Sequence, residues 1–183
     1  MRLARFLEEN KGEIQQRWIN RVLDGYAADA SAIFKREQDR FANPVGYSTR
    51  HTLSAVYSLL FDQPDSEPNM EQIRNELATF VKIRAVQTFT PASAVLFIFD
   101  LKTVVRQFVG QERNLVVIAA EWERFYDIVD RVALVVFDLY MASRERLFQT
   151  QINEIKSMNY MHTQHGCSAS RLADKIPGLT VNP

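Results

Sequence analysis

Three potential metal ligands lie close together near the end of the chain: His162, His165 and Cys167, in the segment HTQHGC. Imidazole and thiolate groups bind zinc and copper, so these residues define one candidate metal or redox site. A structural zinc site needs a fourth ligand and a rigid approach, whereas the surrounding residues are small and polar, as in a tail. The spacing therefore favours a segment without metal, and a metal-binding or redox accessory function remains the alternative.

His51 is the one histidine inside the expected globular body, which makes it the candidate axial ligand if the protein bound haem. A haem iron needs its ligand to face an apolar cavity, and here Arg50 and Thr52 adjoin the histidine. We therefore expect His51 to be exposed or hydrogen-bonded to a protein group. No metal and no cofactor is predicted.

Arg84 and Gln87 lie among apolar residues in the segment IRAVQ. A guanidinium presents a planar fork of donors that suits an anion, so Arg84, Gln87 and Phe97 form the predicted ligand pocket. The competing interpretation is structural: Arg84 would pair with a carboxylate such as Glu37 or Asp39 and cap carbonyl groups at a helix end. Structural ion pairs of this kind are common, which favours the second interpretation.

The sequence carries no recognisable catalytic constellation. A nucleophile elbow, a glycine-rich phosphate loop and a paired-histidine helix motif are all missing from it. Catalysis would have to rest on carboxylates that recur every three or four residues beside two arginines, a pattern typical of a solvated, salt-bridged helix face. We predict that the protein is not an enzyme. The carboxylates are Glu121, Glu123, Asp127 and Asp130, and the arginines are Arg124 and Arg131.

The composition of the chain limits the number of domains and the classes of partner and location that remain. With 183 residues, 46% of them hydrophobic and 24% charged, the chain suits one globular domain with an extension. The 22 basic residues balance the 22 acidic ones, which argues against nucleic acid and membrane surfaces as partners. The single cysteine allows no internal disulfide, no apolar run is long enough to span a bilayer, and the start does not resemble a signal peptide. We expect a cytoplasmic protein.

Six glycines and six prolines divide the chain into long blocks with a helical apolar period, a pattern typical of an all-α protein. Residues 3–26 form one amphipathic helix or a pair broken at Gly12. Asn43-Pro44 and Thr90-Pro91 each supply a cap followed by proline, and Asn69 with Gln72 three residues later forms a capping pair. Further helices are thus expected over about 31–40, 44–61, 69–86 and 90–110. Phe41 and Val45 flank Asn43 in positions suited to a hydrophobic staple.

From 111 to 158 there is neither glycine nor proline, which predicts one very long helix or two helices with a soft joint. At 1.5 Å per residue such a helix spans roughly 70 Å, about twice the diameter of a compact domain of this size. Its far part carries an apolar seam for which a partner helix is the simplest cover. We expect a domain over 1–158, a polar tail over 159–183 and a homodimer formed through the seam, whose residues are Met141, Phe148, Ile152 and Ile155.

Three segments carry a resemblance to a known family: REQDRFANPVG at 36–46, VKIRAVQTFTPASAV at 81–95 and FDLYMASRERLFQTQINEIK at 137–156, together with EENKGEIQQRWINRVL near the start. They resemble the N-terminal domain of RsbR/RsbRD-type co-antagonists of RsbT, sensor modules of bacterial stress-signalling complexes. The residues of the family pattern that we interpret as architecture are Phe41, Asn43, Pro44, Gly46, Thr90 and Pro91.

The resemblance implies an all-helical, globin-like fold without haem, which dimerises and passes a long helix into a STAS domain. After Met158 only about 25 residues remain by count of the sequence, too few for a STAS domain. We therefore expect the input and dimerisation half of such a system: a regulatory or sensory protein without catalysis. It would act through an as yet unknown regulatory protein or a bound small molecule. A bare adaptor without a ligand has the same sequence signature.

Overall fold

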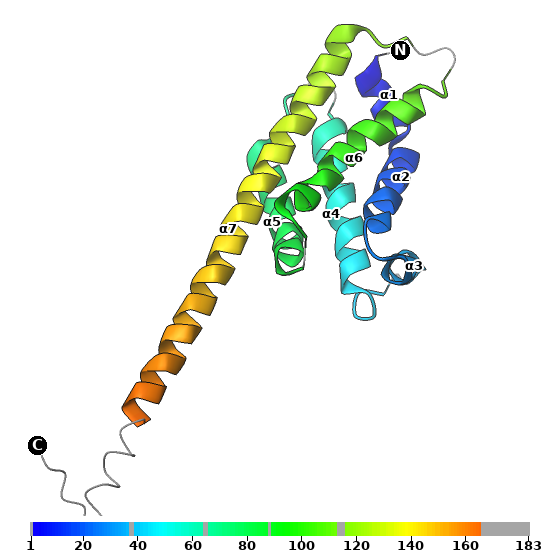
Figure 1. Cartoon of the computed structure of the whole chain (residues 1–183). Coiled ribbons are helices and arrows are strands. Elements are labelled where there is room, and N and C mark those ends of the chain that lie inside the picture. Colours follow the sequence, from blue (N-terminus) through cyan, green and yellow to red (C-terminus); the bar gives the residue numbers. More distant parts are fainter. Residues whose placement is uncertain (1, 37–38, 64–65, 88, 113–115, 166–183) are drawn as a thin grey trace, which may run out of the picture. The chain divides into compact units, whose positions relative to one another are not determined.

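The computed structural model describes the backbone of residues 2–36, 39–63, 66–87, 89–112 and 116–165, and the side chains as far as Met158. Within these ranges the chain forms seven helices and no strands, which confirms the predicted all-α helical bundle with a long C-terminal helix (Figure 1). Two compact units are present, residues 1–144 and residues 145–183, and each is described by itself. In the described parts, no helix is both long and apolar enough to cross a bilayer.

The predicted break near the N-terminus lies at Asn10, not at Gly12. Helices α1 (Leu3–Glu9) and α2 (Lys11–Asp24) meet there, and Gly12 lies inside α2. The backbone N–H of Asn10 and its side-chain Nδ2 both donate to the carbonyl oxygen of Phe6, at 3.1 and 2.9 Å. An asparagine side chain that bonds to nearby backbone competes with helix continuation, which explains why this position interrupts the helix.

The next helices begin at the predicted caps. Asn43 Oδ1 accepts from the N–H of Gly46 at 2.8 Å, Asn69 Oδ1 accepts from two N–H groups of its first turn, and Thr90 Oγ1 accepts from Ser93 N–H at 3.2 Å. Each cap satisfies donors that a helix start leaves unpaired. The preceding helix, α3 (Ala28–Arg36), begins and ends earlier than the predicted range of about 31–40. The bounds of the others are α4 (Pro44–Phe61), α5 (Met70–Val86) and α6 (Pro91–Val109).

The α3–α4 joint is held by Asn43, whose Nδ2 donates to the carbonyl of Phe34 at 2.9 Å. Gly46 lies so close that an added Cβ would meet Asn43 Nδ2 at 2.2 Å and the Phe34 carbonyl oxygen at 2.6 Å. Glycine is therefore required here by space. The expected hydrophobic staple does not form, because the Phe41 side chain is 92% exposed.

The core of the first unit lies between α2, α4, α5 and α6, with α2 packed against α4 and α6, and α5 packed against the same two helices (Figure 1). Two buried side chains also tie elements together by hydrogen bonds: Trp18 Nε1 donates to the Phe97 carbonyl at 2.6 Å, and the Tyr57 hydroxyl donates to the Leu7 carbonyl at 2.8 Å. The largest fully buried side chains are Trp18, Tyr57, Tyr140, Phe80 and Phe97.

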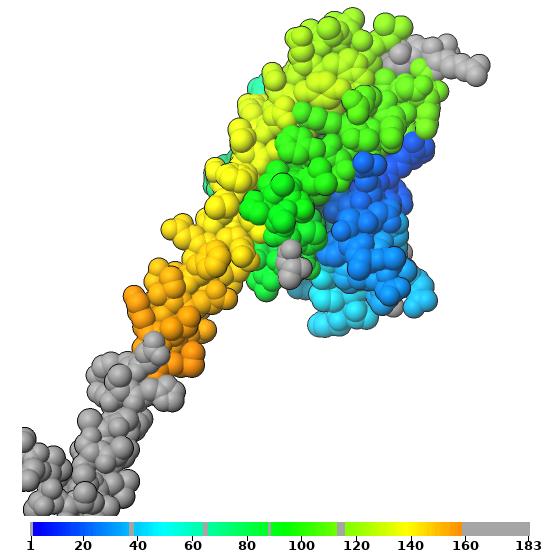
Figure 2. All heavy atoms as spheres, viewed as in Figure 1, coloured from blue at the N-terminus to red at the C-terminus, as the bar shows by residue number. Residues whose placement is uncertain are grey.

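Helix α7 (Ala119–His165) is a single helix that begins later than predicted and continues past Met158. In the first unit its buried face completes the core, through Phe125, Ile128, Val129, Val132, Ala133, Val136 and Tyr140. The atoms of α6 and of this part of α7 adjoin in Figure 2, and Lys102 Nζ on α6 pairs with Asp130 Oδ1 on α7 at 2.6 Å. In the second unit, residues 145–165 continue the helix, and the side chains described there are mostly exposed.

Candidate functional site

Arg84 is a buried cation surrounded by aromatic rings. It lies in the last turn of α5, its side chain is 4% exposed, and its guanidinium carbon is 4.1 Å from the ring centre of Phe89 and 5.2 Å from that of Phe97. The rings of Phe80 and Tyr26 follow at 5.6 and 5.8 Å. Ring faces attract cations, and the attraction is stronger where water is excluded. These five residues are called the Arg84 cluster below.

The hydrogen bonds of Arg84 leave part of its guanidinium unsatisfied. Nη2 donates to the carbonyl of Ser93 at 3.1 Å, and Nη1 lies 3.4 Å from the hydroxyl oxygen of Tyr26. Nε is buried and has no hydrogen-bond partner within the described residues. A buried donor that lacks a hydrogen-bond partner costs free energy.

The predicted ion pair of Arg84 with a carboxylate is not formed with Asp39 or with any other carboxylate in the described ranges, and Glu37 lies outside them. Burial lowers the pKa of Arg84 below its ordinary value, and the phenolic group of Tyr26 and the charge of Asp100 partly oppose this shift. Asp100 itself pairs with Arg21 at 2.6 Å. The cluster is thus a positively charged centre without a direct carboxylate neighbour in the described structure.

Gln87 joins the cluster through Tyr26, whose hydroxyl donates to Gln87 Oε1 at 3.3 Å. Burial raises the pKa of Tyr26, an effect that the positive charge of Arg84 partly offsets. The structure therefore brings the three predicted pocket residues, Arg84, Gln87 and Phe97, to one place, but Tyr26 and the aromatic rings fill the space around the guanidinium. Binding of a ligand by these residues stays a prediction.

Helix α7 holds the connection between α5 and α6 by two hydrogen bonds. The hydroxyl of Tyr140 donates to the carbonyl of Phe89 at 2.7 Å, and Arg144 Nη1 donates to the carbonyl of Ala85 at 3.2 Å. Ala85 adjoins Arg84, and Phe89 supplies the nearest ring of the cluster. The predicted capping of a helix-end carbonyl thus occurs at the end of α5, but Arg144 performs it in place of Arg84.

The apolar seam of α7 is exposed. In the first unit Leu134, Phe137 and Met141 are 66%, 44% and 44% exposed. In the second unit the exposed fractions are 54%, 44%, 55% and 52% for Phe148, Ile152, Ile155 and Met158. Along a helix, steps of three, four and seven residues keep side chains on one side. The four residues predicted to contact a partner, Met141, Phe148, Ile152 and Ile155, are thus all exposed, and contact with a partner stays a prediction.

Two of the four candidate carboxylates on α7 make structural contacts. Asp130 pairs with Lys102, and Glu121 Oε1 accepts a hydrogen bond from the N–H of Leu3 at 3.2 Å. The two arginines of this face share Glu67, at 2.9 Å from Arg131 and 3.4 Å from Arg124. Salt bridges thus form on this face, but they run to other elements of the first unit, and among the described residues the predicted pairing between these carboxylates and the two arginines is not formed.

His51 is exposed, with its ring stacked on that of Tyr47 and Nε2 4.0 Å from Glu76 Oε1. Within the described residues no group of histidine, cysteine and acidic side chains could hold a metal ion. Cys167 lies outside the described residues, and for His162 and His165 only the helical backbone is described.

Sequence reasoning missed Tyr26, Tyr140 and Arg144. Tyr26 adjoins the end of α2 and is separated from Arg84 by 58 residues, so no local pattern links them. Tyr140 occupies an apolar position of the α7 period, where its hydroxyl was a signal for a buried acceptor. Arg144 interrupts the exposed seam, which was the available hint that it has a contact of its own.

A family model described as the RsbT co-antagonist protein rsbRD N-terminal domain matches residues 12–155, from α2 to the second unit's part of α7. No curated protein and no solved structure matches the chain.

Proposed function

Because the chain belongs to the family of RsbT co-antagonist protein rsbRD N-terminal domains, we propose that it is a sensory protein without catalysis that acts as a homodimer through α7. The family is a regulatory one and is not known as catalytic. The observation that carries the proposal is the exposed apolar seam of α7. Within this proposal, a ligand or a partner protein changes the packing near Arg84 and Phe97, and α7 passes the change to the protein that docks on it.

Two hydrogen bonds support the coupling step. Tyr140 and Arg144 both lie on α7. They donate to the carbonyl groups of Phe89, in the α5–α6 connection, and of Ala85, at the end of α5. A movement of Phe89 away from Arg84 would stretch the first of these bonds. Coupling of two sites needs an element that both can bias, and the α5–α6 connection has contacts to both the cluster and α7.

The occupant that we propose for the seam is a second copy of this chain. The exposed residues Leu134, Phe137, Met141, Phe148 and Ile155 recur at steps of three, four and seven, close to the heptad period of two-stranded helical contacts. A twofold interface places the same surface patch of each copy against its partner. A seam made only of apolar side chains can therefore pack against an identical seam. Burial of such side chains stabilises association by removing apolar area from water.

Light scattering coupled to size exclusion tests the dimer. At micromolar concentration we expect twice the 21.2 kDa mass of the chain. The double variant Ile152→Glu/Ile155→Glu is expected to be monomeric, because two carboxylates would be buried at the interface. A matched control, Thr150→Glu/Asn153→Glu, adds the same charge on the opposite side of the helix and should remain dimeric. A monomeric wild-type protein would contradict the proposal.

The coupling has an internal fluorescent reporter, because Trp18 donates its indole N–H to the Phe97 carbonyl at 2.6 Å. The chain has two tryptophans, so Trp122→Phe leaves Trp18 as the only tryptophan. We expect Trp18 emission to change when this variant is diluted from dimer to monomer. If light scattering detects dissociation but the emission spectrum stays the same, the proposed coupling is contradicted and the proposed dimer is not.

A further inference from the structure

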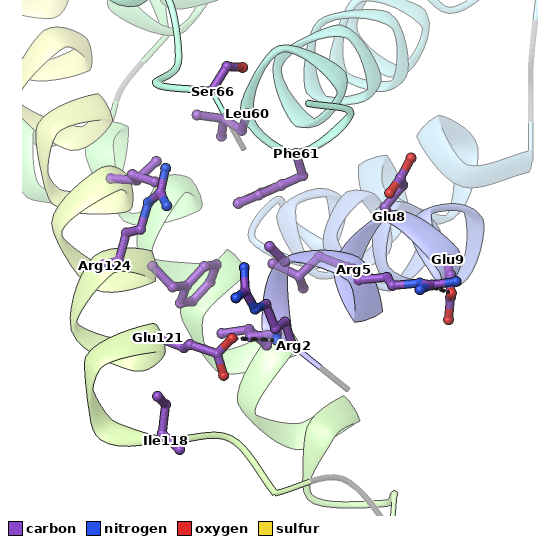
Figure 3. A pocket seen from close by; sticks show the side chains of 15 residues that line it. Arg2, Arg5, Glu8, Glu9, Leu60, Phe61, Ser66, Ile118, Glu121 and Arg124 are labelled. Carbon is purple, nitrogen blue, oxygen red and sulfur yellow. Dashed lines mark hydrogen bonds and ion pairs between the residues drawn. The ribbon is translucent and has the colours of Figure 1, made fainter. Parts of the chain in front are cut away.

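A second candidate site lies in the first unit, away from the Arg84 cluster. The cavity there has a volume of about 850 Å³ and is half-open to solvent. It lies between α1, the end of α4 and the start of α7, as Figure 3 shows. This volume is within the range of cavities that hold small organic molecules.

The wall of the cavity is largely apolar. Leu7 from α1, Phe61 from α4 and Phe125 and Ile128 from α7 line it, and all four side chains are buried in the core. Ile118, which precedes α7, lines the open side and is 62% exposed. A ligand with a hydrophobic body would pack against these side chains and remove the exposed surface of Ile118 from water.

The rim carries three arginines and three glutamates. Whether it favours an anionic or a cationic ligand therefore depends on which of these side chains already have partners. Arg5 is paired with Glu9 at 2.8 Å. Arg124 has Glu67 at 3.4 Å, but Glu67 lies closer to Arg131, at 2.9 Å.

Arg2 is the least engaged of the rim cations. Among the described residues no carboxylate lies within ion-pair distance of its guanidinium. Figure 3 shows the guanidinium groups of Arg2 and Arg124 and the ring of Phe61 around a common space. Two guanidinium groups above an apolar wall match a carboxylate joined to a hydrophobic body.

Two rim glutamates oppose an anion and restrict where it can lie. Glu121 Oε1 accepts a hydrogen bond from Leu3 N–H at 3.2 Å, so its charge is held by the start of α1. Glu8 also lines the edge. The carboxylate of a ligand would therefore lie on the side of Arg124 and Arg2, with its body against Phe61 and Phe125.

We propose that this cavity binds an organic anion with a hydrophobic body, of the class of medium-chain or arylalkyl carboxylates. Such a ligand would join α1 to the start of α7, because Arg124, Phe125 and Ile128 all belong to α7. The site goes beyond the proposed function, since its ligand and its residues are separate from the Arg84 cluster and from the seam.

Calorimetric titration of the full chain with decanoate, below its micellar concentration, tests the proposal. We expect saturable binding of one decanoate per chain and weaker binding of the neutral analogue decanol. Arg2→Ala and Arg124→Ala should each weaken decanoate binding by roughly tenfold, the effect of losing one charge-assisted hydrogen bond. Arg146→Ala, an exposed arginine of the second unit, serves as the charge-matched control and should leave binding unchanged.

Glu121→Gln gives a test of opposite sign. Glutamine keeps an oxygen that can accept from Leu3 N–H and removes a negative charge from the rim, so decanoate should bind more tightly. The proposal is overturned if neither decanoate nor 4-phenylbutyrate binds the folded wild-type protein. It is also overturned if decanol binds as tightly as decanoate, or if the two arginine variants bind like the wild type. None of these outcomes depends on the oligomeric state.

Discussion

The hydroxyl of Tyr140 on α7 donates a hydrogen bond of 2.7 Å to the carbonyl oxygen of Phe89, whose ring lies over the buried guanidinium of Arg84. One side chain of the long helix thus fixes the backbone beside the most unusual charge of the core. This relationship links the helix that carries the exposed seam to the Arg84 cluster, which contains two of the three predicted pocket residues, Arg84 and Phe97.

Tyr140→Phe removes this hydrogen bond and keeps the ring. The Phe89 carbonyl then loses its donor, so we expect the free energy of unfolding to fall by about 1 kcal/mol. Urea denaturation followed by circular dichroism measures this loss. An unchanged midpoint would mean that the bond contributes nothing to the folded state, and the coupling between α7 and the cluster would lose its main support.

Arg84→Met replaces a buried cation by an apolar side chain of similar length. The variant loses the bonds to Ser93 and Tyr26, but it also removes the cost of burying a charge that has no adjacent carboxylate. We expect the free energy of unfolding to change by less than about 1.5 kcal/mol, as for other swaps that keep core volume. Arg84→Ala, which leaves a cavity, should cost about 2–5 kcal/mol by the same assay.

Two glycine variants should act in opposite directions. Gly46→Ala forces a Cβ to within 2.2 Å of Asn43 Nδ2, so we expect a loss of about 1–3 kcal/mol from overpacking at the α3–α4 joint. Gly12→Ala adds a methyl group that meets nothing within 4 Å inside α2, so we expect a gain of about 0.5–1 kcal/mol. Thermal unfolding of both variants checks the signs. A destabilised Gly12→Ala protein would argue against the helix break at Asn10.

Alkaline pH should destabilise the protein through its buried tyrosines. Burial raises the pKa of Tyr57, as does the nearby charge of Asp62, and burial also raises that of Tyr26. When a group has a higher pKa in the folded than in the unfolded state, its contribution is fully present below the unfolded pKa, near 10, and is lost as the pH rises above it. The free energy of unfolding should therefore fall as the pH increases beyond about 10.

Phenolate absorbance provides the measurement for this pH effect. Tyr26 and Tyr57, whose pKa values are raised by burial, should ionise together with unfolding. Tyr57→Phe is the control: it should be less stable at neutral pH, because the bond to the Leu7 carbonyl is lost, but its stability should depend less on pH in the alkaline range. A Tyr57→Phe protein with the wild-type pH dependence would rule out Tyr57 as the source.

Local sequence features determined where most helices begin and end. Asn43, Asn69 and Thr90 are short polar side chains that accept from the first free N–H groups of a helix, so the starts of α4, α5 and α6 followed from the residues alone. The apolar period without glycine or proline likewise predicted a long helical region, but it left open whether one helix or two would form and placed the start too early. The break near the N-terminus did not follow, because the glycine that suggested it is tolerated inside α2 and Asn10 competes for the carbonyl of Phe6.

The tertiary structure alone decided what surrounds Arg84. The sequence analysis singled out Arg84, Gln87 and Phe97. Tyr26, which contacts Arg84 from the α2–α3 connection, and Tyr140 of α7, which binds the Phe89 carbonyl, are both distant in sequence, and a contact between distant segments leaves no mark in local periodicity. The same holds for the cavity beside Arg2 and Arg124, because an opening between α1, α4 and α7 depends on how three helix surfaces meet. The sequence determined which face of each helix is apolar, and tertiary packing determined which of these faces contact each other.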